Sequence, residues 1–219
     1  MTASSSNRKL AGWLALTGAL ALVAYAGRAS GGKPPRDALY QYGFAASGLI
    51  EELFILGIAL WIARGIPWGE LGVRQPRSWG RALGLALVLF IGILIAENAL
   101  ESVLHATREQ GLEPAHWQPD KALAYALNAA VIALVAPLAE EFTYRGLGVA
   151  LLRRFGTVVA IVGTAVAFAA AHGLVEGFPA LFIFGAALAF LRLRTESIFP
   201  GMLFHACFNG IALAVAFVR

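Results

Sequence analysis

Long apolar runs dominate the chain and are separated by short polar links. Hydrophobic residues make up 59% of the sequence, charged residues only 14%, and the mean hydropathy is +0.71. A soluble domain carries about 25% charged residues, so this composition is typical of an integral membrane protein. Because one span needs about 20 residues, we expect an all-α, polytopic transmembrane helical bundle of about seven to eight helices. The apolar runs cover residues 10–26, 44–63, 82–99, 122–139, 158–171, 179–191 and 198–218.

These runs leave no room for a separate soluble domain, so we expect a single integral membrane domain over residues 1–219. Residues 120–218 hold the polar groups described below, and residues 1–119 add N-terminal transmembrane helices. Arg8 and Lys9 precede the first run, as in a signal peptide. Because further spans follow, we interpret this run as a retained transmembrane helix.

The formal net charge is +4, and the arginines cluster at the ends of apolar runs. In that position they orient helices against the lipid surface. No basic stripe with interleaved aromatic residues accompanies them, so we expect the lipid bilayer as a partner and no nucleic acid. Cys207 is the only cysteine, which excludes an intrachain disulfide and metal sites of the Cys-x-x-Cys type.

Three polar groups lie in apolar surroundings in the C-terminal half of the chain. An ionisable side chain at membrane depth costs about 2.5–3.5 kcal/mol on insertion scales, so these groups are expected to have a function. We expect them to line a polar active-site cavity. The groups are Glu140, Glu141 and Arg145; Phe168 and His172; and His205 and Asn209.

The two glutamates of the first group are expected to differ in role. On a helix, Glu141 and Arg145 are i, i+4 neighbours on one face, whereas Glu140 points about 100° away. A structural ion pair at a helix end explains Glu141 as well as catalysis does. It does not explain Glu140, which has no basic neighbour at helical spacing and is free to act as a general base.

A second acidic pair, Glu51-Glu52, lacks an arginine four residues later. We interpret it as the start of an interfacial helix, because acidic side chains suit a helix N-terminus.

The histidines have structural explanations when each is taken alone. Gly173 marks a helix stop directly after His172, and a histidine at a helix end is often a satisfied polar residue. His205 and Asn209 are i, i+4 and share one helix face, where they can form an interhelical hydrogen bond. Together with Glu140 they also supply a base and donors for activating water and stabilising an oxyanion. Alternatively, one glutamate and two histidines can bind zinc and leave a position for water.

The ordered motifs Glu-Glu-x-x-x-Arg, Phe-x-x-x-His and His-x-x-x-Asn resemble those of the CPBP intramembrane proteases. This is the CAAX protease and bacteriocin-processing, or Abi, family, which includes type II CAAX prenyl endopeptidases. The resemblance covers residues 120–218, and residues 1–119 are similar only as membrane helices. All motif positions match, and they are Glu140, Glu141, Arg145, Phe168, His172, His205 and Asn209.

The resemblance implies an intramembrane endopeptidase in which Glu140 activates water with help from His172. His205 and Asn209 are implied to hold the oxyanion, and the second glutamate is implied to orient the site with the arginine. Family members are commonly labelled metalloproteases, yet the eukaryotic enzyme looks glutamate-dependent. We therefore expect no required cofactor, with zinc on Glu140, His172 and His205 as the alternative.

Two other functions remain open from the residues alone. The first is a non-catalytic scaffold or immunity protein of the same fold, since resemblance does not prove activity. The second is a proton-coupled transporter, but transporters place broken helices in two related halves, and here the three polar groups lie in one half. We expect a peptide or protein substrate, which can be lipid-modified, and a multi-pass protein of a bacterial cell membrane.

Overall fold

The computed structural model describes residues 3–31, 37–104 and 117–215, which form seven helices and no strand. This confirms the all-α prediction. The helices are α1 (Ala3–Ala29), α2 (Tyr42–Ala63), α3 (Trp79–Leu104), a continuous stretch from Pro119 to Phe155, α8 (Thr157–Ala171), α9 (Phe178–Thr195) and α10 (Phe199–Val215). A short 3₁₀ turn, Ala38–Tyr40, precedes α2.

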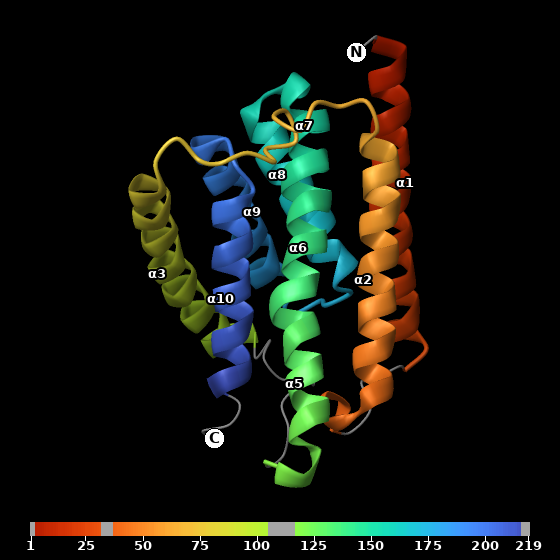
Figure 1. The fold of residues 1–219 in the computed structure, drawn as a ribbon, viewed down its shortest axis with the longest axis vertical. Helices are drawn as coiled ribbons and strands as arrows, with labels where there is room; N and C mark the ends of the chain where they lie inside the picture. The colour runs from red at the N-terminus through yellow and green to blue at the C-terminus, as the bar shows by residue number, and fades with distance from the viewer. Residues whose placement is uncertain (1–2, 32–36, 105–116, 216–219) are drawn as a thin grey trace.

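The stretch from Pro119 to Phe155, here called the motif helix, runs through the middle of the bundle (Figure 1). The apolar run 122–139 covers only part of this helix, and the acidic motif follows the run directly. The helix continues through the motif, where Glu141 and Arg145 form an ion pair inside the bundle. Its consecutive segments are a 3₁₀ turn (Pro119–Lys121), α5 (Ala122–Ala130), a π-helical segment (Val131–Val135), α6 (Ala136–Glu140), a second π-helical segment (Glu141–Gly148), α7 (Val149–Leu152) and a 3₁₀ turn (Arg153–Phe155).

Five of the described helices are long and apolar enough to cross a membrane: α1, α2, α3, the motif helix and α9. The remaining two, α8 and α10, are shorter apolar helices. Helix α9 is longer than the predicted run 179–191, because Arg192 is buried in its last turn and donates to the carbonyl of Glu70 at 2.9 Å. Large apolar side chains such as Leu22 and Val23 are exposed on the outer surface, as expected where helices face lipid. The chain is an integral membrane protein.

Helices from both ends of the chain pack against the motif helix. Helices α1 and α2 lie side by side on one flank in Figure 1, and α10 lies on the other flank with α3 beyond it. The indole of Trp13 in α1 donates to the carbonyl of Thr143 at 2.9 Å. A Cβ at Gly148 would lie 2.6 Å from the Trp13 ring, so glycine is needed for this close approach. The first helix is therefore tied directly to the acidic motif.

Candidate active site

The second π-helical segment carries the acidic motif and is completely buried. A π-helix is rare and is frequently found at functional sites, because its extra residue per turn re-aims side chains. Glu140 is the last residue of α6 and lies directly before this segment. The two glutamates therefore lie at the junction between α-helical and π-helical geometry.

Glu141 and Arg145 form the predicted ion pair. Arg145 Nη1 lies 3.0 Å from Glu141 Oε1, and both side chains are 0% exposed. The guanidinium also stacks over the Phe168 ring at 4.3 Å, and its Nη2 donates to the carbonyl of Gly185 at 3.4 Å. This pair is therefore inaccessible to solvent.

Glu140 is the accessible member of the acidic pair, with 16% of its side chain exposed. Its Oε2 lies 3.5 Å from His205 Nε2, and its Oε1 lies 3.9 Å from His172 Nε2. These separations are too long for strong direct hydrogen bonds. Both imidazoles therefore lie beside Glu140 without forming a strong hydrogen bond to it.

His172 is the C-cap of α8, and Gly173 follows with a positive φ of 65°, as the predicted helix stop requires. A Cβ at Gly173 would lie 2.8 Å from the Cβ of Ala24, so α1 also limits this turn. His172 Nδ1 lies 2.8 Å from the carbonyl of Phe168. Because a carbonyl only accepts, Nδ1 carries the proton, and in the neutral ring the lone pair of Nε2 faces Glu140.

His205 lies between the two glutamates. Its Nδ1 is 3.2 Å from Glu141 Oε1, while its Nε2 faces Glu140. The ring is buried and packs edge-on against Phe184 at 4.9 Å between ring centroids. Because an ionised carboxylate only accepts hydrogen bonds, the Nδ1 that contacts Glu141 is the donor in this bond.

Asn209 contacts the motif helix instead of the glutamates. In the first π-helical segment, the N–H of Ala136 donates to the carbonyl of Val131. By the same π-helical pattern, the carbonyl of Ile132 would accept a hydrogen bond from the N–H of residue 137, but Pro137 has no N–H. The side-chain Nδ2 of Asn209 donates to Ile132 at 2.9 Å in its place. A carboxamide has two N–H donors, so this bond uses one of them.

The interpretation of Glu51-Glu52 as a helix start is wrong. Helix α2 begins at Tyr42, so both residues lie in its middle, because the apolar pattern continues on both sides of them. Glu52 is partly buried and interacts electrostatically with Glu140 and Tyr144. Because Glu52 lies inside the apolar run 44–63, the sequence itself indicates a carboxylate at membrane depth.

Gly201 is a second residue that the sequence did not single out. It lies in the first turn of α10, and a Cβ there would lie 2.8 Å from Glu141 Oε2. Only glycine lets α10 approach Glu141 this closely. The same approach brings His205, one turn later, to both glutamates.

The predicted zinc ligands Glu140, His172 and His205 meet in space. However, the described part of the chain contains no group of three His, Cys, Asp or Glu side chains arranged to hold a metal ion. A catalytic zinc site needs about three protein ligands around one point. No such group is found among the described residues, so no chemical step is assigned to a metal.

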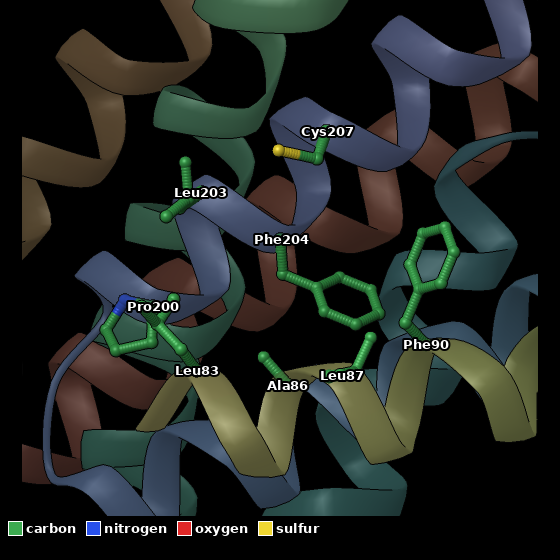
Figure 2. Close-up of a pocket in the computed structure, with 8 residues that line it drawn as sticks. All are labelled: Leu83, Ala86, Leu87, Phe90, Pro200, Leu203, Phe204 and Cys207. Atoms are coloured by element: carbon green, nitrogen blue, oxygen red, sulfur yellow. The ribbon is translucent and has the colours of Figure 1, made fainter. Parts of the chain in front are cut away.

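An apolar groove lies between α3 and α10, next to the site, with a volume of about 180 Å³. Figure 2 shows Leu83, Leu87 and Phe90 of α3 opposite Leu203 and Phe204 of α10. Phe204 directly precedes His205 in the chain and contacts Phe184, against which the His205 ring packs. The groove and the candidate site therefore share one aromatic wall.

Residues 122–211 match the family model described as type II CAAX prenyl endopeptidase Rce1-like. No curated protein and no solved structure matches the chain. The matched region contains all three motifs and every side chain that surrounds Glu140 from the motif helix, α8 and α10. The segment that builds the candidate site is therefore similar to the Rce1-like family of type II CAAX prenyl endopeptidases.

Proposed function

We propose that this protein is an intramembrane endopeptidase in which Glu140 activates the attacking water. The observation that carries the proposal is the position of Glu140 between two imidazoles, partly exposed and without an arginine partner. Glu141, by contrast, is neutralised by Arg145. The chain therefore keeps one carboxylate for structure and one for chemistry.

In the proposed reaction, Glu140 accepts a proton from water while the water oxygen attacks the scissile carbonyl carbon. The Nε2 lone pair of His172 faces the same region and orients this water. When the carbon–nitrogen bond breaks, Glu140 returns the proton to the leaving amine. Water is consumed, and an acid and an amine are formed.

The oxyanion requires donors on the opposite side of the carbonyl group. In this proposal His205 donates from Nε2 and Asn209 donates from its second N–H, both on the same face of α10. Arg145 and Glu141 act indirectly. Glu141 contacts the other nitrogen of the His205 ring, and Arg145 pairs with Glu141. Removing one oxyanion donor typically costs about 10²–10³-fold in kcat.

The substrate we propose is a peptide or protein at the bilayer that carries an apolar or lipid-modified segment. The groove between α3 and α10 supports this proposal, since it is apolar and reaches the aromatic wall behind His205. A hydrocarbon chain in this groove would hold the attached peptide near Glu140.

The proposal is tested by comparing membrane proteomes of cells that contain the wild-type protein or Glu140→Gln. The expected result is a precursor that accumulates uncleaved only with Glu140→Gln. Glu97→Gln is the matched control, because it removes a carboxylate from α3, outside the matched family region. If purified wild-type protein cleaves no accumulated precursor, the protein acts as a scaffold or immunity protein instead.

A further inference from the structure

The apolar groove between α3 and α10 opens on the outer surface of the bundle. Its lining begins near the start of both helices, at Leu83 and Pro200, and continues to Phe90 and Cys207. The eight residues that line the groove carry no charge, and Leu83 and Leu87 are exposed. The groove is therefore accessible from the hydrocarbon of the bilayer.

Helices α3 and α10 run in the same direction, so both N-termini lie at one end of the groove (Figure 1). The positive ends of the two helix dipoles consequently favour an anion at this end. Trp79, the first residue of α3, is exposed, and its indole donates to Gln75 at 2.9 Å. Because tryptophan is enriched at membrane–water interfaces, we place this end of the groove at the level of the lipid headgroups.

The link between α2 and α3, residues 64–78, is fixed against the turn between α9 and α10. The N–H of Ile198 donates to the carbonyl of Gly72 at 2.9 Å, and the Ser197 hydroxyl donates to the carbonyl of Arg74 at 2.6 Å. These bonds hold the link where α3 and α10 begin, so its side chains have a defined position at the end of the groove.

Positive charge is in excess at this end. Glu196, four residues before Pro200, pairs with both Arg74 and Arg77, so one carboxylate faces two guanidinium groups. Arg77 lies 3.4 Å from the carboxylate, and its side chain is 88% exposed. This contact engages one of the five N–H donors of Arg77 and leaves most of the guanidinium uncovered. Six arginines surround two glutamates here: Arg64, Arg74, Arg77, Arg81, Arg192 and Arg194 with Glu70 and Glu196.

A phospholipid with an anionic headgroup is complementary to both parts of this surface. Its acyl chain is as apolar as the groove, and its phosphate oxygens accept charge-assisted hydrogen bonds from a guanidinium fork. A lipid with no net charge, such as phosphatidylcholine, fills the groove equally well but compensates none of the excess positive charge. Headgroup charge should therefore decide which lipid is retained.

We propose that the groove between α3 and α10 is a binding site for one anionic phospholipid, with its acyl chain in the groove and its phosphate on Arg77 and Arg74. Binding is non-covalent. The site has a further consequence that rests on the proposed function: the lipid occupies the place of the apolar substrate segment. Anionic lipid is then a competitive inhibitor, and substrate has to displace it from the groove.

The test uses Cys207, the only cysteine of the chain, as a probe inside the groove. Its thiol is exposed, so N-ethylmaleimide can alkylate it, and the rate is followed by intact-protein mass in detergent micelles. We expect phosphatidylglycerol to slow alkylation about tenfold when about nine-tenths of the sites are filled. Phosphatidylcholine with identical acyl chains should need about tenfold more lipid for the same effect. This comparison uses the wild-type protein alone.

Arg77→Gln tests the headgroup contact, and Arg81→Gln is the matched control. Both arginines are exposed at the same end of the bundle. Arg81 precedes Leu83 by two residues, so it lies on the opposite face of α3 from the groove. At about 0.15 M salt, Arg77→Gln should weaken protection by phosphatidylglycerol about tenfold or more. Arg81→Gln should weaken it less than about threefold, because diffuse attraction is screened.

Three results would overturn the lipid site. Equal protection by the two lipids would show that the headgroup is not recognised. Equal losses in Arg77→Gln and Arg81→Gln would reduce the effect to diffuse surface charge. Phosphatidylglycerol that is retained in native mass spectra but leaves Cys207 fully reactive would place the lipid outside the groove.

The competition with substrate is measured separately. Phosphatidylglycerol should raise KM for an identified precursor and leave kcat unchanged, and Arg77→Gln should remove this effect. Protection of Cys207 without any change in KM would overturn the competition. If Cys207 is protected but the protein cleaves no precursor, the proposed function fails and the lipid site stands. If precursor is cleaved but Cys207 is not protected, the lipid site fails and the proposed function stands.

Discussion

Glu141 Oε1 and His205 Nδ1 lie 3.2 Å apart in the interior of the bundle, although 64 residues separate them in the chain. The same glutamate oxygen pairs with Arg145, and the other nitrogen of the same ring faces Glu140. One buried contact therefore connects the structural ion pair to the proposed catalytic carboxylate. The motif residues act as one unit, and substitutions in different motifs should have related effects.

Glu140→Gln should abolish most activity while leaving the fold intact. Glutamine keeps the size of the side chain but cannot accept a proton from water, so kcat should fall by about 10²–10⁴-fold. The measurement is cleavage of an identified precursor by purified protein, together with its unfolding midpoint. A variant that retains full peptidase activity would show that Glu140 is not the base.

Arg145→Met should be strongly destabilising, because it leaves the charge of Glu141 buried and uncompensated. Breaking a buried pair by removing one partner costs about 3–5 kcal/mol of unfolding free energy. Combining Arg145→Met with Glu141→Gln should recover part of this loss. The measurement is equilibrium unfolding in mixed micelles of the wild-type protein, Arg145→Met and the double variant. A double variant as unstable as Arg145→Met would contradict the pairing.

Gly201→Ala should reduce activity through Glu141 without touching the substrate. The added Cβ would lie 2.8 Å from Glu141 Oε2, and this carboxylate is held by Arg145 and His205. A displacement of about 1 Å at a catalytic group can cost about 10²-fold in rate. Gly210→Ala is the control in α10, since a Cβ there meets nothing within 4 Å. Equal activity of the two variants would refute this positioning role.

Asn209→Ala should affect both stability and rate. The carbonyl of Ile132 loses its side-chain donor, at a cost of about 1 kcal/mol of unfolding free energy. If Asn209 also binds the oxyanion, kcat should fall by about 10²–10³-fold. Asn209→Asp should show both losses as well, because an ionised carboxylate can donate to neither group. A small loss of stability with normal kcat would leave Asn209 with the structural role alone.

Chelators should leave the activity of the purified protein unchanged. The proposed reaction uses Glu140, His172 and water and assigns no step to a metal. The test adds a strong zinc chelator, removes it by dialysis, and measures both cleavage and metal content by mass spectrometry. Activity that is lost with the metal and returns with added zinc would replace this mechanism by zinc-dependent hydrolysis.

Much of the bundle follows from local sequence patterns. Apolar runs predict helices because the hydropathy and the length of a segment depend on that segment alone. The i, i+4 spacing likewise predicts the Glu141–Arg145 pair, which the structure confirms. The placement of Glu51-Glu52 at a helix start was wrong, because a charged pair resembles a helix end when its surroundings in the fold are not known.

The relationships that build the site depend on contacts between distant segments. His205 reaches both glutamates because Gly201 lets α10 approach the motif helix. Asn209 replaces a donor that Pro137 lacks, which requires knowledge of the π-helical hydrogen bonding. Glu52 interacts electrostatically with Glu140 because α2 packs against α6. Periodicity within one helix defines which face a side chain occupies, but only the packing of the helices decides which other side chain it meets.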